Sequence, residues 1–138
     1  MPNKSYAFDS RLEHRALGSA AITSTTTLAT ITERAAQRTD YRTIATVEAI
    51  KISANDELYQ IVVECSNDGF TTLEVADVKD FGATEVRQSG APDSLVADIV
   101  ELYWCTEING TKYAASRVRL IASGTSPSIT LGCYSTVV

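Results

Sequence analysis

Histidine, the residue that most often serves as a general base, occurs once in this chain. His14 lies between Glu13 and Arg15 in a charged stretch close to the N-terminus. A Ser-His-Asp or Cys-His nucleophile would depend on this imidazole, which must be fixed within hydrogen-bond reach of the nucleophile. A charged segment of this kind is a poor place to fix a base, so we expect His14 to be a solvated residue without a catalytic role.

Acidic side chains are plentiful, and paired carboxylates could serve a glycosidase or a metal site. They fall at turns or beside them, where hydrogen bonds to the backbone already explain acidic residues: Asp56 and Glu57, Asp68, Asp77 and Asp80, Asp93 and Asp98. The EF-hand spacing, a P-loop, GxGxxG and HExxH are all absent from the sequence. We therefore expect no enzyme, no catalytic residue, no cofactor and no metal site. A hydrolase with two facing acids is the remaining enzymatic alternative.

The three cysteines, Cys65, Cys105 and Cys133, are far apart and form no CxxC pair. An odd count with such spacing is a poor disulfide framework and a poor zinc site. All three lie in strand-like segments, where a reduced cysteine acts as a small hydrophobic residue. This usage predicts synthesis in a reducing cytosol.

Length and composition predict one globular domain. The chain has 138 residues, of which 44% are hydrophobic and 21% are charged. No segment approaches the roughly 18 apolar residues that span a bilayer, and the opening residues have no apolar core of a secretory signal. We therefore expect no membrane partner.

Charge is distributed unevenly along the chain. The net charge of −5 argues against a nucleic-acid partner, yet residues 1–44 hold six basic and four acidic groups, against six and thirteen in the rest. Such asymmetry often marks an arm that docks on a partner, although an ordinary solvated segment rich in arginine is the alternative. The candidate docking residues are Arg11, Arg15, Arg34, Arg38 and Arg42.

From about Thr43 onward the hydrophobic pattern has the period of β-strands. In residues 58–65, alternate apolar side chains take one face, which predicts a strand with one buried side. The preceding run, 44–52, ends at a polar turn, and we expect the two runs to pair as an antiparallel hairpin. A turn at 66–69 then leads to a third strand at 70–78.

The remaining segments complete an all-β pattern. Residues 81–94 contain three strong breakers and read as a surface connection, whereas Asn109-Gly110 predicts a tight hairpin between 95–108 and 112–122. Residues 129–138 form a last strand, 21–31 favour extended structure, and 33–38 could make a helical turn or a loop. We expect an antiparallel β-sandwich, jelly-roll-like, over residues 21–138, with residues 1–20 as an extended N-terminal arm.

Aromatic residues offer a second kind of candidate site. Tyr103 and Trp104 point to opposite faces of one strand, so at least one should lie outside the core. Tyr113, Arg117 and Arg119 share a strand face, which could stack against sugars or nucleic-acid bases. The interpretation we favour is that the arginines pack over aromatic rings or pair with acidic groups of residues 95–108.

Several short motifs, taken in order, resemble a known family. They are the run from Ala49 to Ile61 (AIKISANDELYQI), SNDGF at 66–70, NGTKY at 109–113 with RVRL at 117–120, and GTSPSI at 124–129. Their order and spacing resemble the small capsid cement (decoration) proteins of tailed bacteriophages, the group typified by the cement protein of a Bordetella short-tailed phage. The arm resembles that group only loosely, through Tyr6, Asp9 and AITST at 21–25.

The resemblance implies a jelly-roll-like sandwich that coats the outside of the capsid, bridges neighbouring major capsid proteins and has no catalytic residues. The implied partners are the major capsid protein and further copies of the chain, with a dimer favoured over a trimer. The implied location is the exterior of the virion. The alternative that the residues themselves leave open is a carbohydrate-binding or tail-associated adhesion module, which rests on exposed Tyr and Trp side chains and the sandwich fold.

Overall fold

The computed structural model describes residues 12–87, 92–95 and 98–138. Within this part the chain is built of β-strands and a short 3₁₀ helix at Thr84–Val86. The strands are β1 (Glu13–Arg15), β2 (Thr26–Gln37), β3 (Asp40–Ile50), β4 (Leu58–Ser66), β5 (Glu74–Gly82), β6 (Ile99–Cys105), β7 (Glu107–Ile108), β8 (Thr111–Ser123) and β9 (Ile129–Val137).

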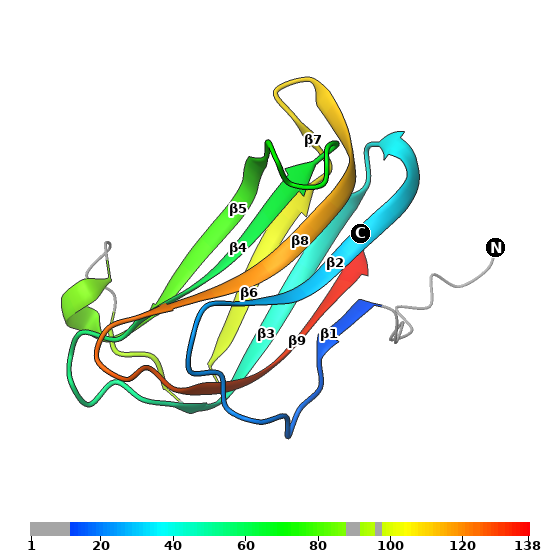
Figure 1. Ribbon diagram of the computed structural model, residues 1–138. Helices are drawn as coiled ribbons and strands as arrows, with labels where there is room; N and C mark the ends of the chain where they lie inside the picture. The colour runs from blue at the N-terminus through cyan, green and yellow to red at the C-terminus, as the bar shows by residue number, and fades with distance from the viewer. Residues whose placement is uncertain (1–11, 88–91, 96–97) are drawn as a thin grey trace.

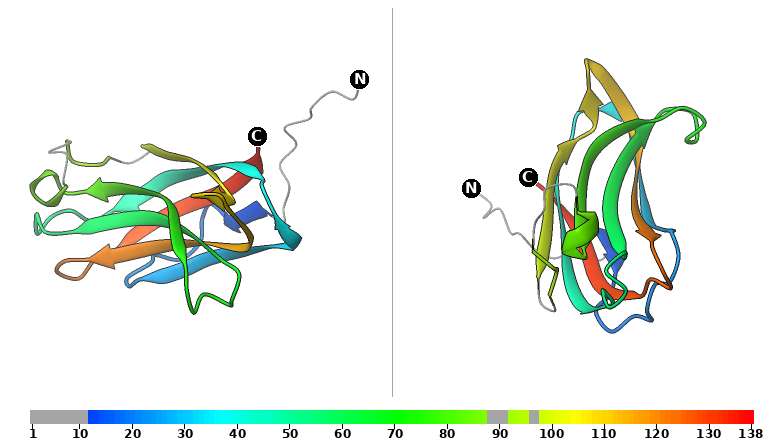
Figure 2. Two further views of the ribbon diagram at one scale, coloured as in Figure 1. Left: turned by 90° about the horizontal axis from the view of Figure 1, so that it is seen from above. Right: turned by 90° about the vertical axis from the view of Figure 1, so that its left-hand side faces the viewer.

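The strands form two antiparallel sheets that pack face to face (Figure 1 and Figure 2). The first, called sheet A, has the order β1-β9-β3-β6, and the second, called sheet B, has the order β2-β8-β4-β5. The short strand β7 pairs with the start of β8. This arrangement confirms the predicted all-β sandwich.

Most connections carry the chain from one sheet to the other. The exceptions are the β4–β5 hairpin, which lies within sheet B, and the short β7–β8 turn. After each crossing the next strand lies in the other sheet, and its apolar face points into the same core from the opposite side. Repeated crossing between two antiparallel sheets is the connectivity of jelly-roll-like sandwiches.

The predicted hairpin between residues 44–52 and 58–65 is wrong. Strand β3 pairs with β9 and β6, whereas β4 pairs with β8 and β5, so the polar segment between them is a crossover. Alternation and a turn reveal two strands with one buried face each, but they do not say which strand is the neighbour. The Tyr59 hydroxyl bridges the two sheets at this end by donating to the carbonyl of Lys51 at 2.8 Å.

Two further local predictions have different outcomes. Residues 33–37 continue β2 as a strand, so the expected helical turn or loop at 33–38 is wrong. The turn at Asn109 and Gly110 is confirmed, with φ values of 50° and 81° at these residues. The paired part of this hairpin is short. Only β7 pairs with the start of β8, because the preceding strand β6 belongs to sheet A and the rest of β8 belongs to sheet B.

The core lies between the two sheets and draws aromatic side chains from both. The Tyr41 and Trp104 rings of sheet A stack with centroids 4.6 Å apart, and those of Tyr59 and Phe81 in sheet B stack at 5.8 Å. Other fully buried side chains are Ile61, Val63, Leu102, Val118, Leu120, Ile129 and Leu131.

The later part of the predicted arm lies on the sandwich. Residues 13–15 form β1, which pairs with the edge of β9, and Ile22 exchanges backbone hydrogen bonds with Ile129 at 2.7 and 3.0 Å. Residues 1–11 are outside the described part of the chain.

Candidate functional site

The predicted docking arginines do not gather into one basic patch. Arg11 lies outside the described residues, Arg15 is on β1 of sheet A, and Arg34 is exposed on β2 of sheet B. Arg15 is engaged locally, because its guanidinium donates a hydrogen bond to the carbonyl of Ala20. Arg34 therefore lies in sheet B, whereas Arg15 of β1 and Arg42 of β3 lie in sheet A.

Arg38 and Arg42 are each neutralised by a carboxylate. The Arg38 guanidinium lies 3.2 Å from the Asp40 carboxylate, and that of Arg42 lies 2.7 Å from Glu101. The carboxylate beside each guanidinium raises its pKa, Asp40 for Arg38 and Glu101 for Arg42. These two residues therefore provide paired charges and directional hydrogen bonds rather than free positive charge.

Arg42 belongs to an exposed cluster on sheet A, which we call the Tyr103 patch. The Tyr103 side chain is 62% exposed, Arg42 lies over its ring with 5.6 Å from the guanidinium carbon to the centroid, and the Tyr103 hydroxyl donates to Glu101 at 3.3 Å. The patch consists of Arg42, Glu101, Tyr103, Val137 and Val138. An exposed aromatic ring with aliphatic neighbours and an arginine is the composition enriched at interaction surfaces.

Hollows adjoin the Tyr103 ring. One, of about 360 Å³, is also lined by Arg42, Thr136 and Val137, and another, of about 290 Å³, reaches toward Asp40. The register of three strands creates the first hollow, because Arg42 of β3 lies opposite Tyr103 of β6 and Thr136 of β9. A partner side chain or a small ring could therefore lie against Tyr103 on either side.

Trp104 follows Tyr103 in β6, and its side chain points to the opposite face of the sheet, as alternation along a strand predicts. Its side chain is buried against Tyr41, and its indole Nε1 donates to the Thr43 hydroxyl at 2.8 Å. The prediction of opposite faces for Tyr103 and Trp104 is confirmed. Tyr103 is the exposed ring, at 62% against 5% for Trp104, and the Trp104 ring also lines the hollow that reaches toward Asp40.

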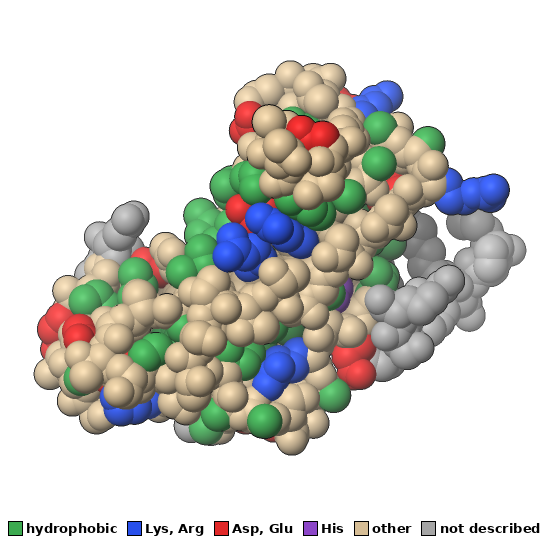
Figure 3. Space-filling model, in the orientation of Figure 1, with side chains coloured by type: hydrophobic (Ala, Val, Ile, Leu, Met, Phe, Trp, Pro, Cys, Tyr) green, Lys and Arg blue, Asp and Glu red, His purple; other side chains and the backbone are tan. Residues whose placement is uncertain are grey.

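The outer face of sheet B carries an arginine cluster (Figure 3). The Arg117 guanidinium lies 2.8 Å from the Glu64 carboxylate, that of Arg119 lies 3.5 Å from it, and Arg117 stacks over Phe70 at 4.4 Å. The favoured packing of arginine over an aromatic ring is confirmed. The acidic partner is Glu64 of β4 rather than a residue of 95–108, and Tyr113 packs against the core.

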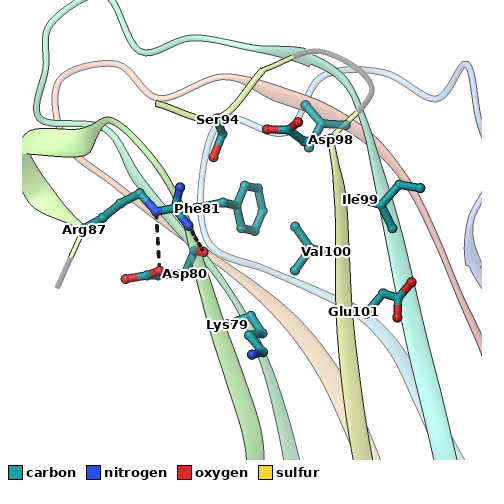
Figure 4. A pocket seen from close by; sticks show the side chains of 10 residues that line it. Lys79, Asp80, Phe81, Arg87, Ser94, Asp98, Ile99, Val100 and Glu101 are labelled. Atoms are coloured by element: carbon teal, nitrogen blue, oxygen red, sulfur yellow. Dashed lines mark hydrogen bonds and ion pairs between the residues drawn. The ribbon is translucent and has the colours of Figure 1, made fainter. Parts of the chain in front are cut away.

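A third candidate is a hollow of about 250 Å³ between β5 and β6 (Figure 4). Most of its charged groups are already engaged: Arg87 lies 3.5 Å from Asp80, and the Asp98 carboxylate accepts from the backbone N–H of Leu95 at 2.7 Å, while Lys79 also lines the hollow. Glu101, at its rim, pairs with Arg42. The hollow therefore offers no set of converging groups for a ligand.

His14 is not the solvated residue that the sequence predicts. Its Nε2 lies 2.6 Å from the Ser135 hydroxyl, and desolvation by burial lowers its pKa from 6.5 to about 4. The pair has the atoms of a serine nucleophile and its base, but the Ser135 side chain faces the core and is 3% exposed. The contact therefore serves to hold β1 on β9. The sequence could not predict this burial, because three residues, Glu13 to Arg15, are too few to show an alternating pattern.

Among residues 12–87, 92–95 and 98–138, no three histidine, cysteine or acidic side chains come together as metal ligands. The same part of the chain contains no helix with the length and apolar character needed to cross a bilayer. Comparisons with family models, curated proteins and solved structures give no match to the chain.

Proposed function

We propose that the protein is a capsid cement protein of a tailed bacteriophage, which binds the outer surface of the major capsid protein shell and stabilises the head. The observation that carries the proposal is the ordered set of motifs at 49–61, 66–70, 109–120 and 124–129. These motifs belong to an all-β sandwich, the fold that the resemblance implies.

The motifs also contact one another in pairs. Thr125 of the last motif donates to the Asp56 carboxylate of the first through its backbone N–H at 3.0 Å and its hydroxyl at 2.7 Å. Between the second and third motifs, the Asn67 side chain donates to the carbonyl of Lys112 at 2.9 Å, and Arg117 lies over Phe70. Motifs that contact one another shape the loops of the sandwich together. Their order and spacing therefore support the resemblance more strongly than the same number of unconnected turns would.

The Tyr103 patch is the surface that we assign to the capsid. An exposed tyrosine and two exposed valines would be buried between capsomers, and their burial adds binding energy that exists only in the assembled shell. Repeated copies on a symmetric shell make modest contacts effective through avidity. A shell stabilised in this way resists internal pressure without any chemical step.

The experiment uses purified protein and expanded capsids that lack it. Binding with a rise in capsid rupture temperature is expected, and no binding at saturating concentration would contradict the function. Tyr103→Ala should weaken binding by about tenfold or more, as expected for a central aromatic anchor. Val78→Ala, at an exposed valine of sheet B, is the matched control and should bind as the parent does. Equal binding by both variants would exclude the patch but leave the function standing.

The arginines are tested separately at low salt. Deletion of residues 1–11 removes Arg11, and Arg34→Ala removes an exposed charge while β1 stays in place. Weaker binding that disappears at high salt is expected if they dock on an acidic surface, because exposed charges are screened. Unchanged affinity would remove these residues from the interface.

The second candidate function is a carbohydrate-binding or tail-associated adhesion module. It is favoured by the exposed Tyr103 ring, with a hollow adjoining it and an arginine and a carboxylate at its edge. A glycan array distinguishes the two: specific sugar binding that is lost in Tyr103→Ala would support the module and count against the cement function.

A further inference from the structure

Residues 13–22, which we call the strap, lie along the edge of sheet A and are held at separate points. Glu13 and Arg15 pair with Tyr134 and Cys133 of β9 across a register shift. Leu17 then packs over Gly132, where an added Cβ would lie 2.6 Å from the leucine Cδ2. The Gly18 N–H donates to both Glu48 carboxylate oxygens, at 3.1 and 3.0 Å, and Ile22 closes the strap against Ile129.

These contacts make the strap a weak element of the fold. Its strand is three residues long, whereas β9 has nine, and the Leu17 side chain remains 66% exposed. Elements with few buried contacts and short ladders open at a lower free energy than the core strands. A single buried interaction can therefore decide whether the strap stays closed.

That interaction is a chain of hydrogen bonds beginning at His14. Its Nε2 lies 2.6 Å from the Ser135 hydroxyl, which lies 2.7 Å from the Thr43 hydroxyl. The indole N–H of Trp104 donates to Thr43 at 2.8 Å, and an indole can only donate. The directions that satisfy every hydroxyl run from Trp104 to Thr43, on to Ser135 and finally to a neutral His14 acceptor.

Protonation disrupts this chain. A positively charged imidazole must donate to Ser135, so the Ser135 hydroxyl proton loses His14 as its acceptor. If Ser135 instead donates to Thr43, the Thr43 proton is left without an acceptor, so one of the two hydroxyl protons loses its partner in either case. The charge itself would be held in a desolvated place, which is costly unless the charge is paired. His14 Nδ1 has no hydrogen-bond partner among the described residues, so no acceptor stands ready to stabilise the cation.

The ionisable groups on the surrounding elements do not provide that pairing. Burial alone is the cause that lowers the pKa of His14 to about 4. On the strap itself, Arg15 donates to the Ala20 carbonyl, and across the sandwich the Glu33 carboxylate accepts from Tyr41 at 2.9 Å. The ionisable groups concerned are Glu13 and Arg15 on β1, Cys133 and Tyr134 on β9, Glu33 and Arg34 on β2, and Tyr41, Arg42 and Glu48 on β3.

We propose that the strap is an acid-released element, which detaches from β9 when His14 takes up a proton. Detachment leaves the edge of β9 around Cys133 and Tyr134 without its partner strand. The device is independent of the proposed capsid function.

The direction of the pH effect follows from linkage. The closed strap holds His14 with a pKa of about 4, against 6.5 for the free side chain, so the open strap binds the proton more readily. Closure is most favourable above pH 6.5 and weakens as the pH falls toward 4. From these two values, the opening constant should be about 30-fold larger at pH 5 than at pH 7.5.

Hydrogen exchange on the full chain measures this constant directly. The parent and His14→Gln are compared at the same pH, which cancels the intrinsic pH dependence of exchange. Gln keeps an acceptor for Ser135 but does not titrate in this range. For each variant, the exchange rate of the strap amides at pH 5 is divided by the rate at pH 7.5. This ratio should be about 30 times larger in the parent than in His14→Gln, while the amides of β4 stay protected in both. Trp104, the only tryptophan, gives an independent fluorescence signal for the same transition.

Glu48→Gln is the control for a general loosening of the strap. It changes the other polar contact, at Gly18, and should retain the pH step because His14 is intact. The same pH profile in the parent and in His14→Gln would overturn the proposal. So would a rise in exchange that is equal in the strap and in β4, since the acid effect would then be global unfolding.

Discussion

Gly124 lies so close to Asp56 that a Cβ at position 124 would be 2.4 Å from the Asp56 carbonyl oxygen. The contact joins the β8–β9 crossover to the β3–β4 crossover at one end of the sandwich. Beside it, the Lys51 ammonium donates to the Thr125 carbonyl at 2.8 Å and lies 3.3 Å from the fully buried carboxylate of Glu57. The two crossovers are thus locked together by a close backbone approach and by charge.

Gly124→Ala should destabilise the fold strongly. The glycine has a φ of +103°, and its missing side chain is the space occupied by Asp56 and Glu57, so alanine adds both backbone strain and a clash. We expect the free energy of unfolding to fall by about 3 kcal/mol or more, measured by urea denaturation. Gly69→Ala is the matched control, because Gly69 has a φ of +68° but nothing within 4 Å, and it should cost about 1 kcal/mol. Equal losses would mean that the close approach does not matter.

The turns on either side of β4 should make stability depend on acid pH. Hydrogen bonds from Thr125 lower the pKa of Asp56, and those from Thr72 lower the pKa of Asp68. For Glu57, burial acts to raise the pKa, but the Ala54 N–H and Lys51 outweigh it and lower it. Carboxylates with lowered pKa values stabilise the fold above their ordinary values of 3.8 and 4.5, and this contribution is lost as the pH falls below them.

Urea unfolding from pH 5 to pH 2.5 measures this dependence. The background is His14→Gln, so that the histidine does not contribute. Asp68→Asn should flatten part of the slope, since the amide cannot take up the proton. A stability that does not change over this range would show that the three carboxylates titrate alike in the folded and unfolded chains.

The strands were predictable because their residues alternate, whereas the pairing was not. Residues 58–65 show one buried face whatever their neighbours are, and Asn109-Gly110 specifies its own turn because both residues accept positive φ. The segment 51–57 is polar and turn-like in either a hairpin or a crossover, so its role depended on contacts with Gly82 and Gly124 that are distant in sequence.

The candidate surface was predictable only in part, for the same reason. Alternation placed Tyr103 and Trp104 on opposite faces, but it could not decide which one was exposed. Arg42, Glu101 and Val137 join Tyr103 through the register of three separate strands. His14 was placed wrongly because three residues show no period, and its burial follows from a pairing with β9.

The two kinds of ion pair should differ in strength, as a double-mutant cycle can show. The side chains of Arg117 and Glu64 are 24% and 9% exposed, and the arginine is also fixed over Phe70. We expect a coupling energy of about 1 to 2 kcal/mol between Arg117 and Glu64. Arg38 and Asp40, which are more than half exposed, should couple by less than about 0.5 kcal/mol. A larger coupling at the exposed pair would contradict the role of burial.

The three cysteines should react very differently in the folded protein. Burial raises the pKa of Cys133 to about 12 and also raises that of Cys65, while the side chain of Cys105 is partly exposed. At pH 8 a thiol with the pKa of Cys133 is ionised in only about one molecule in 10,000, and the thiolate is the reactive form. Limited treatment with iodoacetamide should therefore label Cys105 first.

Mass spectrometry of the digested protein locates the label. Urea-unfolded protein is the control and should be labelled at all three positions at similar rates, because unfolding removes the desolvation of Cys65 and Cys133. Early labelling of Cys133 in native protein would mean that the β1–β9 side of the sandwich opens often. Cysteine labelling tests the closed strap at pH 8, where part of the exposed thiol is ionised and reactive. At pH 5 thiols are protonated, so the opening of the strap is followed there by hydrogen exchange.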